Sequence, residues 1–170
     1  GEVRLLPEGG TVNATDTTVT IDGADALTII IDVRTDYNNK DYMQLCAATV
    51  DKSANKGYGT LRAAHVADYT ALFGRMDISF GEGAGCHLPT DTRLKLAQAG
   101  ASDPKLDALF FQYGRYMLIS SSRPSGMPLC ANLQGIWNDN GACNMPWTCD
   151  YHLDINIQQN YWAANRANLA

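Results

Sequence analysis

Arg75-Met-Asp-Ile-Ser-Phe-Gly-Glu-Gly-Ala-Gly85 is the stretch in which this chain changes from one kind of structure to another. Its first part alternates polar and apolar side chains, with Met76, Ile78 and Phe80 on one side, which predicts a β-strand over 75–80. The glycines that follow interrupt this alternation. No Lys-Ser/Thr pair comes after them, so the sequence favours a turn or linker over a phosphate-binding loop.

The residues before this break carry mostly the two-residue period of β-strands. Residues 18–21 alternate, and the Asp-Gly pair that follows indicates a turn. Between 27 and 33 every second side chain is apolar, so we predict a strand buried mainly on its apolar face. Residues 36–42 predict a polar loop, and an apolar stripe over 61–73 predicts a helix. The apolar strand face comprises Leu27, Ile29, Ile31 and Val33.

After the break, apolar residues recur with the period of helices. Residues 91–99 predict a short helix that ends at Gly100. Asp103-Pro104 predicts the start of the next helix, because Asp caps helices and proline fits their first position. Residues 157–170 predict a helix rich in Ala, Asn and aromatic side chains. This helix has no stop signal, so we expect it to continue past the last residue given.

A β-rich part, a Gly-rich break and a helical part together predict a mixed α and β chain with a domain boundary near 81–90. Of the 170 residues, 45% are hydrophobic and 18% charged, which is a globular composition. The net charge of −5 and the absence of a Lys/Arg run argue against a nucleic-acid or anionic-membrane surface. No stretch approaches the ~20 apolar residues that span a bilayer. We therefore expect a neutral or small ligand, with no nucleic acid and no membrane as partner.

The chain has five cysteines, an odd number that argues against a complete disulfide framework. Cys143 and Cys149 could pair with each other, or could form a zinc site with His152. Their spacing fits no common zinc finger, so the sequence favours structural thiols, free or paired, and predicts neither a metal nor a cofactor.

Residues 119–162 combine all three tryptophans with a high density of amide and acidic side chains. Sugar hydroxyls need fixed donors and acceptors, and the apolar face of a sugar stacks on aromatic rings. The alternative is a long loop in which these side chains satisfy backbone groups. The polar residues are Arg123, Asn132, Gln134, Asn138, Asp150, His152, Asp154, Asn156 and Asn160.

Asp154-Ile155-Asn156 places two polar side chains two residues apart. If this segment is extended, both side chains point to one side, with His152 as a third in the row, and a helix could begin near Asn156. Alternatively, Asp154 caps a helix that starts near Ile155. The serine run over 120–122 lies in no G-x-S-x-G motif, so we expect it to end the helix predicted over 106–119.

Three motifs between 111 and 162 resemble, in the same order, glycoside hydrolase family 95, the 1,2-α-L-fucosidase group. Phe111-Gln-Tyr-Gly-Arg-Tyr-Met-Leu-Ile-Ser-Ser-Ser-Arg-Pro124 is similar to the first barrel helix of that family. Ala131-Asn-Leu-Gln-Gly-Ile-Trp-Asn138 follows, and then Pro146-Trp147 with Tyr151-His-Leu-Asp-Ile-Asn-Ile-Gln-Gln-Asn-Tyr-Trp162. Before residue 60 the resemblance is weaker.

The resemblance implies a domain order and a reaction. Residues 1–82 would be the end of an N-terminal β-sandwich domain with a connecting helix, 83–105 a linker, and 106–170 the first part of an (α/α)6 barrel. The enzyme would be secreted or periplasmic and would remove terminal α-linked L-fucose from glycans with inversion. A Glu acid and an Asp base, ~6.5–9.5 Å apart, would lie further along the barrel. The alternatives are an α-L-galactosidase of the same family and a non-catalytic carbohydrate-binding module.

The resemblance also implies roles for individual residues. Asn156 matches an asparagine that positions the attacking water. Asp154 replaces an amide by a carboxylate, which only accepts hydrogen bonds, so it would position water or assist the base. His152 matches a histidine near C6 of the sugar, which favours fucose over galactose. The residues expected in the pocket wall are Trp137, Asn138, Asn132 and Gln134.

Overall fold

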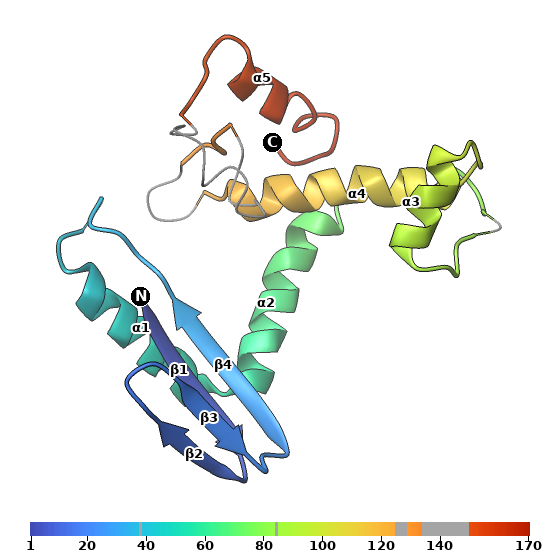
Figure 1. Ribbon diagram of the computed structural model, residues 1–170. Coiled ribbons are helices and arrows are strands. Elements are labelled where there is room, and N and C mark those ends of the chain that lie inside the picture. The colour runs from blue at the N-terminus through green and yellow to red at the C-terminus, as the bar shows by residue number, and fades with distance from the viewer. Residues whose placement is uncertain (38, 84, 125–128, 134–149) are drawn as a thin grey trace. The chain divides into compact units, whose positions relative to one another are not determined.

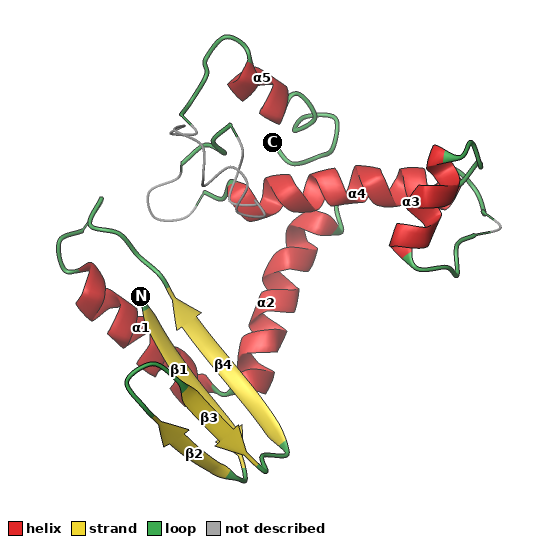
Figure 2. Ribbon diagram, viewed as in Figure 1, coloured by secondary structure: helices red, strands yellow, loops and turns green. Residues whose placement is uncertain are grey.

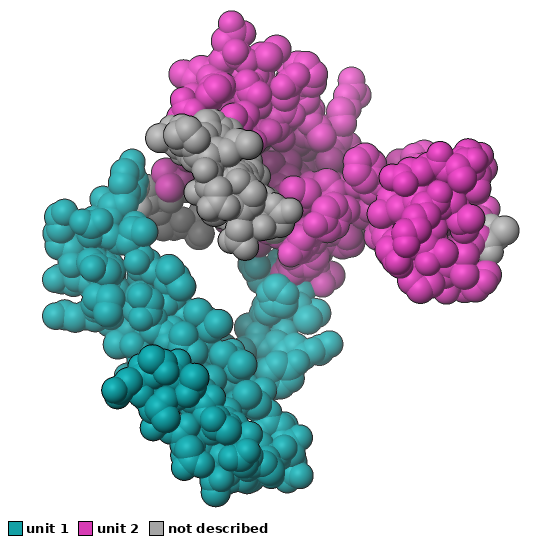
Figure 3. All heavy atoms as spheres, in the orientation of Figure 1, with its two compact units in different colours: residues 1–68 teal, residues 69–170 magenta. Residues whose placement is uncertain are grey.

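The computed structural model describes residues 1–37, 39–83, 85–124, 129–133 and 150–170. They divide into two compact units, residues 1–68 and 69–170 (Figure 3). Strands precede helices along the chain, which confirms the predicted mixed α and β class (Figures 1 and 2). No helix among the described residues is long and apolar enough to cross a membrane. The elements are β1 (Glu2–Glu8), β2 (Thr11–Ala14), β3 (Val19–Asp22), β4 (Ala26–Asp32), α1 (Tyr42–Lys56), α2 (Tyr58–Phe73), α3 (Thr90–Gln98), α4 (Pro104–Ser121) and α5 (Asn156–Tyr161).

The first unit contains an antiparallel ribbon of nested strand pairs. β1 pairs with β4, and β2 pairs with β3 between them. Glycines with positive φ lie where one ladder passes into the next, and Gly23 supplies the predicted turn with φ 68°. A Cβ on Gly10 would lie 2.4 Å from the carbonyl oxygen of Asp22, so only glycine fits this crossing.

The apolar row of β4 does not form the buried face that its alternation predicts. Ile29 and Ile31 are 53% and 63% exposed, whereas the opposite face of the strand is half-buried. That opposite face takes α1, a helix that the sequence analysis missed and in which Cys46 and Val50 are fully buried. Arg34 Nη2 donates to Thr49 Oγ1 of α1 at 2.9 Å. Packing of α1 and polar bonds at the edge of the sheet therefore determine which face of β4 is buried.

In the second unit, α3 and α4 begin or end close to the residues that the sequence predicts as helix starts and stops. Asp103 is the N-cap of α4 and accepts a hydrogen bond from the backbone N–H of Leu106 at 3.0 Å, with Pro104 in the first turn. α3 ends just before Gly100, whose φ is 94°. α4 ends at Ser121, within the serine run, as predicted.

The Gly-rich break packs closely against the cap of α4. A Cβ on Gly83 would lie 2.9 Å from Oδ1 of Asp103. The backbone N–H of Cys86 donates to the carbonyl of Gly83 at 3.2 Å, which closes a turn. The break is thus a turn that needs a small residue beside a carboxylate, in agreement with the prediction.

The strand predicted over 75–80 is wrong: these residues are described and form none. The cause is Arg115 in α4, which is 2% exposed. Its guanidinium donates to the carbonyls of Leu72, Phe73 and Met76 at 3.2, 2.8 and 2.9 Å. A side chain, and not a neighbouring strand, therefore satisfies the backbone at the end of α2 and beyond it.

The helix predicted over 157–170 is also too long. α5 has only six residues, and turns follow it. Arg115 Nε donates to the carbonyl of Ala167 at 3.2 Å, and Asn168 takes a positive φ of 54°. Because that carbonyl is bound by a side chain from α4, the last residues fold back as turns instead of continuing the helix.

Candidate functional site

α5 begins at Asn156, which is one of the two helix starts that the sequence allows. Its N-cap is Ile155, without a side-chain capping bond, so Asp154 does not cap this helix. Residues 153–155 form a turn, not the extended segment that would align Asp154 with Asn156. Asn156 is half-buried and Asp154 exposed, so one amide and one carboxylate lie at the start of a short helix.

His152 lies just before this turn and is exposed. Its Nε2 lies 2.9 Å from Oδ1 of Asp150, and its carbonyl accepts a hydrogen bond from the backbone N–H of Ile157 at 3.0 Å. The carboxylate fixes the orientation of the imidazole ring, and the carbonyl ties the residue to the first turn of α5.

A second segment, residues 129–133, lies against α5. Asn160 Nδ2 donates to the carbonyl of Asn132 at 3.2 Å. Ala131 N donates to the hydroxyl of Tyr161 at 2.7 Å, and the same hydroxyl is hydrogen-bonded to Ser122 Oγ. These bonds bring the segment that carries Asn132 to the helix that carries Asn156.

The side-chain oxygen of Asn132 is buried and has no hydrogen-bond partner within the part of the chain that the structure describes. An unpaired buried acceptor costs about 1–3 kcal/mol, so native structures seldom keep one without a reason. This oxygen is chemically suited to accept a hydrogen bond from a hydroxyl group.

The other predicted wall residues, Gln134, Trp137 and Asn138, lie outside the described residues, as do Cys143 and Cys149. The structure therefore brings Asn132, His152, Asp154 and Asn156 into one unit through α5 and its neighbours.

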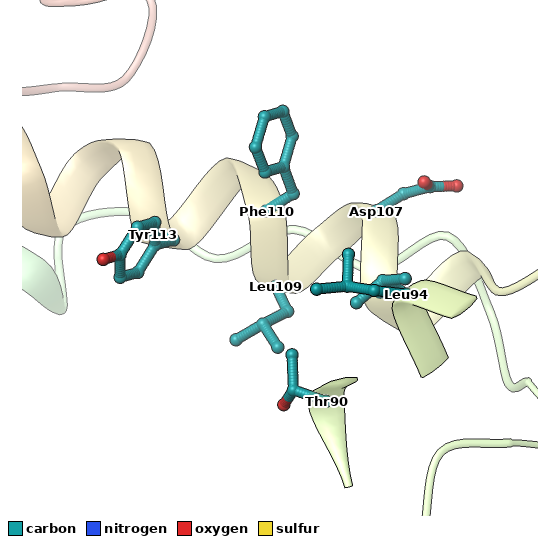
Figure 4. A pocket seen from close by; sticks show the side chains of 7 residues that line it. Thr90, Leu94, Asp107, Leu109, Phe110 and Tyr113 are labelled. Atoms are coloured by element: carbon teal, nitrogen blue, oxygen red, sulfur yellow. The ribbon is translucent and has the colours of Figure 1, made fainter. Parts of the chain in front are cut away.

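A pocket with a volume of about 620 Å³ lies between α3 and α4 (Figure 4). Leu109 points to one side of α4, whereas Phe110 and Asp107 point to the other. The pocket contains none of the predicted site residues, and its walls are mainly apolar, so it lacks the donors and acceptors that a sugar needs. Its lining residues are Thr90, Leu94, Leu106, Asp107, Leu109, Phe110 and Tyr113.

Comparison with known families agrees with the motifs around α4 and α5. Residues 57–170 match the glycosyl hydrolase family 95 catalytic domain. This chain belongs to glycosyl hydrolase family 95.

Three relatives of this family 95 chain carry α-fucosidase names. It is 36% identical over 121 residues to "Probable alpha-fucosidase A" of Aspergillus niger, which is 71% of this chain and 15% of the relative. It is 38% identical over 129 residues to "Alpha-L-fucosidase 2" of Arabidopsis thaliana, which is 73% of this chain and 15% of the relative. A "Probable alpha-fucosidase A" of Aspergillus oryzae is 30% identical over 160 residues, which is 85% of this chain and 22% of the relative. The chain thus spans between 15% and 22% of the length of these relatives.

Local sequence patterns did not predict three residues that hold the candidate site together. The hydroxyl groups of Tyr161 and Ser122 are hydrogen-bonded to each other, although the two residues are 39 positions apart in the sequence. Arg115 donates to the carbonyl of Ala167 in the turns after α5. Of the three, only Arg115 left a signal in the periodicity of its own helix: it is an arginine inside a helix that is otherwise apolar on its buried side. A charged side chain in that setting must find partners, and here they are carbonyl groups.

Proposed function

We propose that this chain is part of an enzyme that removes terminal α-linked L-fucose from glycans with inversion at the anomeric carbon. The observation that carries the proposal is the family 95 match across α4 and α5, where Asn156 begins a helix fastened to the Asn132 segment. Because the chain spans 15–22% of its relatives, the Glu acid and the Asp base would come from later parts of a longer polypeptide.

In an inverting reaction, one carboxylic acid protonates the leaving oxygen and a base takes a proton from the attacking water. An amide both donates and accepts, so Asn156 would hold that water while the base removes its proton. Asp154 accepts hydrogen bonds only, so it would orient one water proton or assist the base. Its exposure in the turn before α5 leaves its carboxylate open to such a water.

Sugar recognition would involve residues on both segments. His152, oriented by Asp150, would contact the C6 end of fucose, and Asn132 would form part of the pocket wall. Gln134, Trp137 and Asn138 would complete the pocket wall.

The same proposal includes the domain order. Residues 1–82 would end a β-sandwich domain, 83–105 would be a linker, and 106–170 would begin an (α/α)6 barrel in a secreted or periplasmic protein. The 170-residue chain alone would then bind sugar at most and would not turn it over.

The test uses a polypeptide of the relatives' length that contains this sequence, with the 170-residue chain beside it. Each is incubated with 2′-fucosyllactose, and NMR follows the anomeric form of the sugar released. The proposal predicts that the long polypeptide first releases β-L-fucose and that the short chain releases none. Initial release of α-L-fucose would contradict inversion. Binding without release by the long polypeptide would indicate a carbohydrate-binding module. Faster release of L-galactose from the corresponding α-L-galactosyl substrate would indicate an α-L-galactosidase.

A further inference from the structure

We propose that Tyr161 is a positioning residue whose hydroxyl fixes the Asn132 segment relative to α5, and so aligns sugar recognition with water positioning. This inference rests on the proposed function and adds a residue to it. We call the contacts of the Tyr161 hydroxyl with Ala131 N and Ser122 Oγ the Tyr161 bridge.

The Tyr161 bridge joins three parts of the second unit. Tyr161 is the last residue of α5, and Ser122 directly follows α4. Ala131 lies in the 129–133 segment, 30 residues before Tyr161, and donates its backbone N–H at 2.7 Å. A tyrosine hydroxyl has one proton and two lone pairs, so it can accept from Ala131 while it donates to Ser122. A phenylalanine ring of the same shape could make neither bond.

The neighbouring residue makes the attachment specific. Asn160 donates from Nδ2 to the carbonyl of Asn132 at 3.2 Å. Consecutive residues of α5 therefore hold the N–H of Ala131 and the carbonyl of Asn132, on either side of the Asn132 side chain. Asn156 and Asn160 are four residues apart and share a face of the helix. The backbone that presents Asn132 is thus held one helical turn from Asn156.

The 129–133 segment is exposed at its start and half-buried from Ala131 to Leu133. Leu129 is 50% exposed and Cys130 is exposed. Tyr151 donates its hydroxyl to the carbonyl of Cys130 at 3.1 Å, but it is itself 47% exposed. Polar bonds therefore contribute to the position of this segment, and among the described residues the Tyr161 hydroxyl makes the shortest of those to its backbone.

The test is Tyr161→Phe in the long polypeptide, with 2′-fucosyllactose as substrate. Loss of the hydroxyl frees the Asn132 segment to shift, and a misplacement of about 1 Å can cost about 100-fold in rate. We expect kcat/KM to fall by about 10- to 100-fold, mostly in kcat, while the folded protein persists in a thermal melt. Tyr113→Phe is the matched control: this ring stacks on Tyr116 in α4, and its variant should keep kcat/KM.

A double variant tests whether the bridge acts as one unit. Ser122→Ala/Tyr161→Phe should lose no more activity than Tyr161→Phe alone, because residues in one hydrogen-bonded network are not additive. Losses that multiply would overturn the bridge. A lower melting temperature with unchanged kcat/KM would show a structural role only and would overturn the positioning role.

Hydrogen–deuterium exchange separates this inference from the proposed function. The amide of Ala131 should exchange faster in Tyr161→Phe than in the unsubstituted protein, and Tyr113→Phe should leave it unchanged. If the unsubstituted protein releases no fucose, the proposed function fails, and the exchange of Ala131 still decides the bridge. Equal exchange in Tyr161→Phe and the unsubstituted protein would overturn it.

Discussion

Arg93 and Asp103 form a two-point ion pair that joins α3 to the start of α4. Nε of Arg93 lies 2.8 Å from Oδ2 of Asp103, and Nη2 lies 3.0 Å from Oδ1. Their side chains are only 8% and 9% exposed. The same carboxylate also caps α4 through the backbone N–H of Leu106. One buried carboxylate therefore fixes both a helix start and a contact between helices.

Arg93→Leu should lower the melting temperature of the second unit clearly. It removes both hydrogen bonds of the guanidinium and leaves a carboxylate with low exposure and no cation. Lys95→Leu is the control, because Lys95 and Asp91 form an exposed pair at 3.8 Å that contributes little. Melts of the two variants followed by circular dichroism compare them, and equal losses would contradict a special role for Arg93.

The pH dependence of stability should report the same pair. Chiefly the hydrogen bond from Arg93, helped by the bond from Leu106 N, lowers the pKa of Asp103. A carboxyl with a lowered folded-state pKa stabilises the fold fully above its unfolded pKa of about 3.9, and loses that contribution as pH falls through the lower value. The stability difference between the unsubstituted chain and Asp103→Asn should therefore shrink below about pH 4. Chemical denaturation between pH 2 and 6 measures it, and a difference independent of pH would refute the assignment.

Gly83→Ala should destabilise the chain by about 1–3 kcal/mol, because the added methyl group overpacks the turn beside Asp103. Its Cβ would lie 2.9 Å from Oδ1 of Asp103. Gly59→Ala in α2 is the opposite case: its Cβ meets nothing within 4 Å, and alanine in a helix should stabilise by about 0.5–1 kcal/mol. Urea unfolding measures both variants, and the prediction fails if they change stability in the same direction.

Arg115→Leu should detach the turns after α5 and destabilise the second unit. It removes the guanidinium donor from the carbonyls of Phe73 and Ala167, at about 1–3 kcal/mol for each one that stays buried. The carbonyls of Leu72 and Met76 lose the same donor but keep a second one, the backbone N–H of Arg75 and Nε2 of Gln112. Arg115→Lys should recover part of the loss, because an ammonium group still donates to some of them. Thermal melts and hydrogen exchange of 163–169 measure the effect. A melt unchanged by Arg115→Leu would show that these bonds do not matter.

The sequence predicted the features that depend on neighbouring residues. Asp103-Pro104, Gly100 and the start of α5 at Asn156 are such features, and the structure confirms them. The predictions over 75–80 and 157–170 failed because Arg115 binds carbonyl groups 39 to 52 residues away. The alternation in β4 predicted correctly which residues share a face of the strand. It did not predict which of the two faces α1 covers.

In the candidate site too, the sequence predicted local features and missed contacts between distant residues. The polar density around 152–156 marked the place of α5, whereas the Tyr161 bridge joins Ser122 and Ala131 across 39 and 30 residues. No local pattern carries a contact of that range. The family resemblance supplied the motif that contains Tyr161, and the structure supplied the partners of its hydroxyl.

The rate of fucose release by Asn156→Gly in the long polypeptide, with 2′-fucosyllactose at saturating concentration, tests directly whether Asn156 positions the attacking water. If Asn156 positions the attacking water, kcat should fall by at least about 100-fold, within the range that proton-transfer catalysis contributes. The melting temperature should stay close to that of Gln158→Ala, an exposed change in the same helix that should keep full activity. An unchanged kcat in Asn156→Gly would show that Asn156 does not position that water.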